Sequence, residues 1–244
     1  MSENPLTFNQ TVFAITEFIE VAIHTILYVR QVYPAEIFVR RKKYDTPVFQ
    51  SRHPSLNQYV SGAVKAIGDE LIHGKVDKVI VVIKDKEQVP LERFIFSIET
   101  MIEVDGFNKD TSVEEAISAV SLGQYFRAFL VKLNMIESQI GQMHLGDNVS
   151  FAIIIEFKDD VAPTHSNTKD PPPWIPAMSQ DTSAGASDDS ELHMVRAVNT
   201  GIINVSLTVQ ESGEKVLREQ RRRAAEKLEE IPVEHKNKDE PKVG

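Results

Sequence analysis

The residues of this sequence that could perform acid–base chemistry are few and isolated. His24 lies in an apolar stretch, with Glu20 and Tyr28 one helical turn away, so it can be a general base or a structural histidine. Asp159 and Asp160 can be a carboxylate pair or a solvated turn, and no candidate nucleophile accompanies them. We favour the structural alternative in both cases and predict no catalytic residue.

Motifs that hold phosphates, metals or acyl groups do not occur in the sequence. It contains neither a G-x-x-x-x-G-K nor a G-x-G-x-x-G phosphate loop, no G-x-S-x-G elbow and no H-E-x-x-H pair. The seven histidines lack the spacing of metal ligands, and there is no cysteine. We therefore expect no metal and no cofactor. The lack of cysteine is typical of a reducing compartment such as the cytosol or the nucleus.

The charge distribution argues against direct binding of nucleic acid. The net charge is −9, and an acidic surface repels phosphates. Residues 211–244 carry as many basic as acidic groups, so the whole deficit lies in residues 1–210. The basic run 40–43 can be a phosphate contact, a nuclear address or a solvated loop, whereas the run 221–223 is surrounded by glutamates. No signal sequence or bilayer-length apolar run is expected, so we predict no membrane partner.

The apolar pattern predicts an α+β domain in which an antiparallel sheet packs against three helices. Helical periods of about 3.6 residues occur in residues 8–33, 54–71 and 122–140. Strands are indicated in residues 79–83, 94–98, 149–157 and 202–210. Pro34 lies just past the first helix, and Thr111 with Glu114 predicts a capping box for the third.

A long polar segment separates the last two predicted strands. Residues 158–192 are rich in proline, serine, threonine and acids, and connections of this length are usually functional or disordered. The only tryptophan, Trp174, lies here among four prolines, in KDPPPWIPAM. It can be an interface anchor or a loop residue packed on its own core. For residues 213–244 we expect a frayed helix followed by disorder.

Several sequence blocks resemble the HORMA-domain family. They are EFIEVAIHTILYVRQVYPAEIF, RRKKYDTPV, HPSLNQYV and VDKVIVVIKDKEQVPLERFIF, with RAFLVKL and PPPWIP further on. Within the family, the blocks are most similar to its mitotic-arrest-deficient-like branch, the accessory subunits of translesion DNA polymerase zeta. The resemblance implies a HORMA core in residues 1–157, a mobile safety belt and returning strand in residues 158–212, and a charged, disordered tail in residues 213–244.

The resemblance also implies three sets of contact residues. A peptide held under the safety belt would contact Tyr59, Trp174 and Ile175, and Leu56 joins them by helical spacing. The implied dimer contacts are Arg127, Arg40 and Gln31. A scaffold-binding surface would include Val195, Ser206 and Thr208, although these residues differ from the family pattern at that surface.

The function that the resemblance implies is that of a non-catalytic adaptor in the nucleus alone or in both the nucleus and the cytoplasm. Its expected partners are a peptide of the polymerase zeta catalytic subunit and the deoxycytidyl-transferase scaffold of translesion synthesis. A homodimer or a heterodimer with another HORMA protein, and an AAA+ ATPase that remodels the belt, are also implied. The alternative is a HORMA adaptor of the mitotic or meiotic checkpoint or of the chromosome axis, which would bind other peptides by the same means.

Overall fold

The computed structural model of the 244-residue chain describes residues 4–104, 106, 108–143, 149–159, 161–164 and 174–229. Its helices are α1 (Phe8–Val29), α2 (Pro54–Leu71), α3 (Ala119–Asn134), α4 (Glu137–Ile140) and α5 (Gly213–Glu229), with short 3₁₀ turns η1 (Ala35–Ile37), η2 (Ser179–Asp181) and η3 (Ser183–Gly185). Its strands are β1 (Phe38–Lys43), β2 (Thr46–Ser51), β3 (Val76–Asp85), β4 (Pro90–Thr100), β5 (Val149–Phe157), β6 (Glu191–Asn199) and β7 (Ile203–Glu211).

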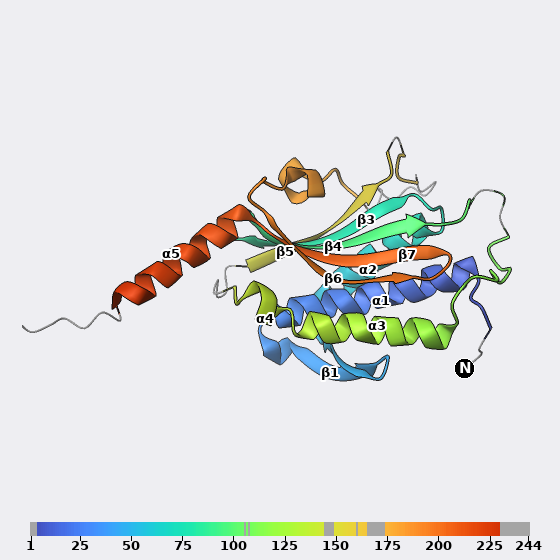
Figure 1. Cartoon of the computed structure of the whole chain (residues 1–244), viewed down its shortest axis with the longest axis horizontal. Helices are drawn as coiled ribbons and strands as arrows, with labels where there is room; N and C mark the ends of the chain where they lie inside the picture. The colour runs from blue at the N-terminus through green and yellow to red at the C-terminus, as the bar shows by residue number, and fades with distance from the viewer. Residues whose placement is uncertain are drawn as a thin grey trace, which may run out of the picture.

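Five strands form one antiparallel sheet, in the order β5-β3-β4-β7-β6. Helices α1, α2 and α3 cover one face of this sheet, and β1 and β2 form a separate hairpin beside them (Figure 1). The predicted α+β class, with an antiparallel sheet against three helices, is confirmed. The basic run 40–43 lies in strand β1 rather than in a loop.

Helix α1 forms the centre of the core. The side chain and backbone of Thr7 exchange hydrogen bonds of 3.1 and 3.0 Å with Gln10, which is the capping box that starts the helix. Phe18 stacks on Phe126 of α3 at 4.3 Å and meets Phe96 of β4 edge-on at 6.3 Å. By length and composition α1 could span a membrane, but 56% of its most apolar window is buried within the protein, as in a core helix.

The start of α3 differs from the sequence prediction. Ser118, not Thr111, caps the helix, and its side chain accepts a hydrogen bond of 3.2 Å from the N–H of Ser121. Residues 111–118 instead form backbone contacts with the N-terminal segment, including the bond of 3.2 Å from Val113 N to Leu6 O. The local capping signal was therefore overridden by tertiary pairing. The predicted stripe ends in the separate helix α4, because α3 stops before Met135.

Strand β6 was missed by the sequence analysis. Its register against β7 shifts between Met194 and Arg196, so a bulge interrupts the alternation of inward and outward side chains. Val195 lies at this bulge and is buried. The returning segment is consequently a β6–β7 hairpin, which pairs with β4 through β7.

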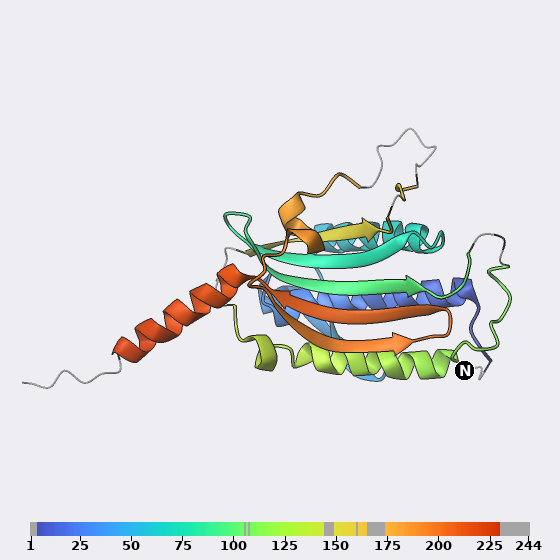
Figure 2. The ribbon, with the colours of Figure 1, turned by 45° about the horizontal axis from the view of Figure 1, so that its top comes forward.

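Helix α5 leaves the body of the molecule and extends away from the sheet (Figures 1 and 2). The sequence predicted a frayed helix and disorder for residues 213–244; residues 213–229 are helical, and residues 230–244 lie outside the described residues. The apolar face of α5 is thin, and for this reason the sequence predicts fraying. At the first turn, however, the buried Lys215 forms ion pairs with acidic groups, which hold the helix in place of apolar contacts.

Candidate functional site

The outer edge of β5 has no partner strand in the part of the chain that the structure describes. The strand is nevertheless apolar, and its Ile153 and Ile154 are each only 7% exposed. An edge strand presents a row of free backbone N–H and C=O groups that can pair with another extended chain. This edge can therefore accept an additional strand.

A groove of about 610 Å³ lies along this edge, and we call it the β5 groove. One wall is formed by residues 152–155 and 157 of β5 together with Tyr59 of α2. The other wall is formed by residues 163–164 and 174–178 and by Asp181, which belong to the connection between β5 and β6. The groove is thus enclosed between the sheet edge and the β5–β6 connection (residues 158–190).

Four residues predicted to bind peptide lie in or beside this groove. Trp174 is half-buried against the core, and its indole Nε1 is shielded from water with no acceptor among the described residues. Ile175 points outward and is 87% exposed. Tyr59 is 48% exposed and meets the ring of Phe151 edge-on at 5.6 Å. Leu56 is largely buried and lines a second hollow of about 440 Å³ that shares Tyr59 with the β5 groove.

The described parts of the β5–β6 connection are fastened to the sheet by polar contacts. Near its start, the backbone N–H and the hydroxyl of Thr164 donate to the carboxylate of Glu70 at 2.8 and 3.0 Å. Near its end, Asp181 forms an ion pair of 3.1 Å with Lys84 of β3, and both side chains are buried. Thr164 is exposed, but Glu70, Lys84 and Asp181 are buried, so breaking either contact would leave a buried charge without this partner.

A third contact involves Glu156 of β5. Its carboxylate accepts hydrogen bonds from the backbone and the hydroxyl of Ser183, the latter at 2.6 Å, and lies 3.1 Å from the ammonium group of Lys78. Burial raises the pKa of Glu156, but the Ser183 hydrogen bonds and Lys78 outweigh burial and hold this pKa below its usual range. Glu156 is therefore an anion at neutral pH and a firm attachment point.

These contacts define the path of the connection. Its described parts follow the end of β5 on one edge of the sheet, contact β3 and β4 at η2 and β5 and β3 at η3, and enter β6 on the opposite edge (Figure 2). Consequently, a strand added to the free edge of β5 would lie between that edge and the connection.

We expect Asp181→Asn to increase the rate at which a protease cuts the β5–β6 connection roughly tenfold or more, because it leaves Lys84 buried without its counter-charge. Limited proteolysis of the folded protein measures this rate. Asp188→Asn is the matched control, since Asp188 is exposed in the same connection. Equal cleavage of the two variants would show that the Lys84–Asp181 pair does not hold the connection closed.

The described acid–base candidates, His24 and Asp159, occupy ordinary structural positions. His24 is 3% exposed inside α1, and burial lowers its pKa to about 4. Asp159 is exposed in a turn after β5, and Asp160 lies outside the described residues. The structural reading of His24 therefore agrees with its position, because a buried neutral imidazole inside a helix meets no substrate.

The depressed pKa of His24 makes stability depend on pH. The pKa in the folded state is about 4, against 6.5 as the ordinary value, so the unfolded chain binds the extra proton as the pH falls. The stabilising effect is fully present above pH ~6.5 and is lost toward pH ~4. Between pH 7 and pH 5 we expect a loss of about 2 kcal/mol in the free energy of unfolding.

Urea titrations at the two pH values test this expectation. His24→Leu should remove most of this pH dependence, whereas replacement of the exposed His73 by Gln should leave it unchanged. If the slope persists in His24→Leu, another group is responsible for it.

The three predicted dimer contacts do not line one groove. Arg127 of α3 lines a second groove, of about 940 Å³, between α1, α3 and the β1–β2 hairpin, next to the exposed ring of Phe13. Arg40 and Gln31 are exposed but do not line this groove. Gln31 follows the far end of α1, roughly 20 Å along the helix axis from the groove residue Glu17, at about 1.5 Å per residue.

The three predicted scaffold contacts divide between the two faces of the sheet. Val195 is 1% exposed and packs into the core, so it offers no side chain to a partner in this structure. Ser206 and Thr208 of β7 point to the other face of the sheet and remain half-buried. Met194, which is opposite Thr208 and 61% exposed, presents more apolar area on that surface than the predicted residues do.

The protein is an α+β domain in which helices cover one face of an antiparallel sheet. The β6–β7 hairpin forms one edge of the sheet, and the β5 groove lies at the other edge, beneath the β5–β6 connection. The HORMA domain model matches residues 12–144, so this chain belongs to the HORMA-domain family, and the predicted HORMA fold is confirmed.

Relatives and a solved structure agree with this assignment. The chain is 34% identical to the rat (Rattus norvegicus) mitotic spindle assembly checkpoint protein MAD2B over 88% of this chain and 98% of the rat protein. It is 39% identical to the DNA polymerase zeta processivity subunit of Schizosaccharomyces pombe over 48% of this chain and 55% of that protein. The structure of C. elegans HTP-2 bound to HTP-3 closure motif 1 superposes with a TM-score of 0.64 and 12% identity, covering 83% of this chain and 86% of that chain.

Sequence reasoning missed the residues that fasten the connection. Lys84 ends an apolar strand and Asp181 lies in a polar segment, so neither shows a pattern that links it to the other. The same holds for Glu70 and Thr164, which are separated by 94 residues. A lysine within a buried strand is the one available signal, since buried lysines require a partner.

Proposed function

We propose that this protein is a non-catalytic adaptor that binds an extended segment of another protein in the β5 groove. The observation that carries the proposal is the free edge of β5 beneath the Trp174-bearing connection. Extended peptides commonly bind by adding a strand to a sheet edge, with pockets that take alternate side chains. In this proposal the β5–β6 connection acts as the safety belt, and Trp174, Tyr59 and Ile175 contact the guest, with Leu56 lining the adjoining hollow.

The proposed guest is a short segment of the catalytic subunit of DNA polymerase zeta. Support comes from the fission yeast relative, whose name describes it as a subunit of that polymerase. The adaptor would link this subunit to the deoxycytidyl-transferase scaffold of translesion synthesis in the nucleus, through a surface that includes Ser206 and Thr208. The indole N–H of Trp174 would donate to a guest carbonyl, because it is buried and has no acceptor among the described residues.

Enclosure of the guest has a kinetic consequence. A chain that lies between the sheet edge and the fastened connection cannot leave sideways, so release requires local opening of the connection. Dissociation is therefore expected to be slow and to depend on the Lys84–Asp181 pair. An AAA+ ATPase that opens the connection would accelerate it.

The groove beside Arg127 is the proposed contact for a second HORMA domain, either another copy of this chain or a related protein. It combines exposed apolar area at Phe13 and Val120 with the charges of Arg127 and Lys42. An unchanged sedimentation mass of Arg127→Ala relative to a dimeric wild type would exclude this face.

A second function is favoured by the name of the rat relative, which describes a spindle assembly checkpoint protein. HTP-2, whose fold is similar, is bound to a closure motif in its solved structure. The protein would then enclose a peptide of a checkpoint or chromosome-axis partner in the same groove. Only the identity of the guest distinguishes the two functions.

The test is a binding survey with the full-length protein. Overlapping peptides that cover the polymerase zeta catalytic subunit are compared with peptides from checkpoint and chromosome-axis proteins of the same organism. We expect a catalytic-subunit segment to bind, to dissociate slowly and to protect the β5–β6 connection from protease. Binding of the other set alone would establish the second function, and binding of neither would refute the adaptor proposal.

A further inference from the structure

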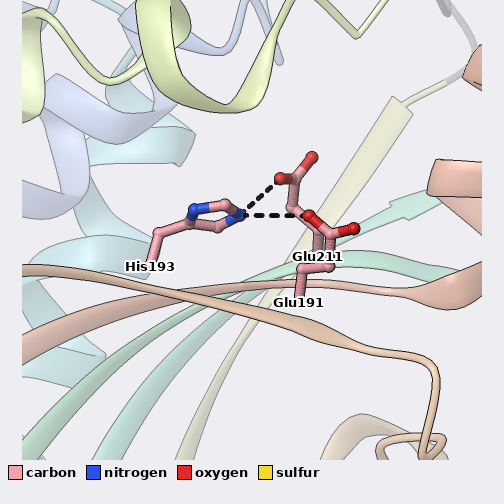
Figure 3. Close-up of side chains that lie close together, drawn as sticks. All are labelled: Glu191, His193 and Glu211. Carbon is pink, nitrogen blue, oxygen red and sulfur yellow. Dashed lines mark ion pairs between the residues drawn. The ribbon is translucent and has the colours of Figure 1, made fainter.

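Three side chains with metal-ligating groups converge at the root of α5. Glu191 and His193 come from β6 and Glu211 from β7 (Figure 3). His193 Nε2 lies 2.7 Å from Glu211 Oε2 and 3.9 Å from Glu191 Oε2. The ligand atoms of the three residues all lie within 4.8 Å of one another. The cluster lies away from the β5 groove, on the opposite edge of the sheet.

Strand geometry explains why these side chains meet. Glu191 and His193 are two residues apart in β6, so both point to the same face of the sheet. Glu211 is the direct partner of Glu191 across the β6–β7 pair and the diagonal neighbour of His193, which faces Val209. The hairpin therefore fixes all three groups through its backbone register and does not rely on a flexible loop.

The local charge balance favours a cation at this position. Glu92, Glu211 and Glu191 are aligned across β4, β7 and β6, because Glu211 pairs with both of the others. Like charges directly opposite in a sheet are destabilising unless a cation separates them. In the described part of the chain, the permanent cations within ion-pair distance of this row are Arg30 and Lys215.

Both of these cations contact Glu92, which is the end of the row on the central strand β4. Arg30 and Lys215 contact Glu92, and Lys215 also contacts Oε1 of Glu211. Among the described residues, the imidazole of His193 is the one ion-pair contact of Glu211 Oε2 and of the Glu191 carboxylate. The outer end of the row thus has two carboxylates and one titratable ring, and it lacks a permanent positive charge among the described residues.

The environment of the His193 imidazole also favours a bound ligand. Its Nε2 is shielded from water and, although it lies close to two carboxylates, it makes no well-directed hydrogen bond with any described residue. Buried polar atoms without a partner are uncommon and call for an explanation. A ring nitrogen that converges with two carboxylate oxygens, without donating to either, has the arrangement of a ligand to a shared cation.

We propose that Glu191, His193 and Glu211 bind a divalent transition-metal ion of the zinc class. One imidazole and two carboxylates are zinc ligands, at about 2.0–2.2 Å from the metal, and water completes a tetrahedral set. Adjacent ligands of such a tetrahedron are roughly 3.3 Å apart, from those bond lengths. The two His193 separations are 2.7 and 3.9 Å, and the ligand atoms of all three residues lie within 4.8 Å of one another. Small side-chain rotations are therefore enough to form the site.

The remaining contacts of Glu211 would support this site. Lys215 holds Oε1, which leaves Oε2 as the metal ligand and fixes the carboxylate plane. The ion would join the first residue of β6 to the last residue of β7, where the β5–β6 connection ends and α5 begins. The sequence expectation of no metal rested on histidine spacing, and a site with one histidine escapes that criterion.

Zinc titration of the full-length protein, with any polyhistidine tag removed, tests the proposal. We expect one Zn²⁺ per chain in competition with a chromophoric chelator, and Co²⁺ as a spectroscopic probe should give the absorption of a tetrahedral site. His193→Gln and Glu191→Gln should each weaken Zn²⁺ binding by roughly 100-fold, since loss of a supporting partner alone costs 10- to 100-fold. Both side chains are partly exposed, so these variants should fold.

His73→Gln provides the matched control, because this exposed histidine lies at the end of α2. It should bind Zn²⁺ like the wild type. Zn²⁺ should also raise the unfolding temperature of the wild type and of His73→Gln, but not that of His193→Gln. Absence of stoichiometric Zn²⁺ binding, or equal binding by His193→Gln and the wild type, would overturn the proposal and leave the cluster as a histidine–carboxylate ion pair.

Discussion

Replacing Trp174 by alanine is expected to weaken binding of the guest peptide by about 30- to 1,000-fold, or ~2–4 kcal/mol. The indole is half-buried against the core and forms part of the wall of the β5 groove. Its removal would open the groove to water and delete a large rigid contact surface. Because the connection would then close less firmly over the guest, most of the loss should appear as faster dissociation. Surface-immobilised peptide and measured off-rates provide the test.

Two further variants separate the causes of this loss. Trp174→Phe keeps most of the ring area but removes the N–H, so an intermediate effect would assign part of the energy to a bond from the indole. Leu192→Ala removes an apolar side chain that is 64% exposed on β6, away from the groove, and should leave peptide binding unchanged. Wild-type affinity of Trp174→Ala would mean that the guest binds elsewhere.

The sequence predicted the core of the fold well because its period is simple there. The apolar stripe of α1 and the runs in β3 and β4 are buried on most sides, so pattern and environment agree. The sequence prediction fails where contacts between residues far apart in the chain determine the structure. The Thr111 capping signal is overridden by pairing of residues 111–118 with the N-terminal segment. The bulge at Val195 interrupts the alternating pattern by which β6 could be recognised in the sequence.

The residues of the candidate site also fall into two groups: those that the sequence reveals and those that depend on contacts between distant parts of the chain. Trp174 could be singled out from the sequence because a large apolar residue in a polar, proline-rich segment is anomalous. Tyr59 required the family resemblance, since an aromatic residue on a helix is common. The buried Lys84–Asp181 pair joins residues that are 97 positions apart, and its partners become evident only when the connection is placed over the sheet.

The C-terminal helix is where charge, and not apolar burial, determines the structure. Lys215 is 4% exposed in the first turn of α5, and its ammonium group lies 2.7 Å from Glu92 and also contacts Glu211. It donates a further hydrogen bond of 2.7 Å to the carbonyl of Ile140, at the end of α4. Arg30, just past the end of α1, donates to both oxygens of Glu92, at 2.6 Å to the Oε1 that Lys215 also contacts and at 2.9 Å to Oε2. Three helices and two strands therefore share one buried network.

Replacing Lys215 by methionine is accordingly expected to destabilise the protein by about 3–5 kcal/mol. The methionine side chain preserves the volume, but Glu92 and Glu211 are directly opposite across β4 and β7, and Arg30 would be the one permanent cation of the described residues left within ion-pair distance of them. The energy is lost because buried charge is left uncompensated, not because a cavity forms. Urea denaturation at neutral pH measures the change in the free energy of unfolding.

Two controls identify the source of this loss. Arg221→Met makes a similar substitution at an exposed position of α5 and should change stability by no more than about 0.5 kcal/mol. The double variant Glu211→Gln/Lys215→Met removes the opposing charge with the lysine, so it should be more stable than Lys215→Met alone. An equal urea midpoint for Lys215→Met and Arg221→Met would show that the network does not hold α5. A double variant no more stable than the single one would locate the loss in the contacts of Lys215 with Glu92 and Ile140.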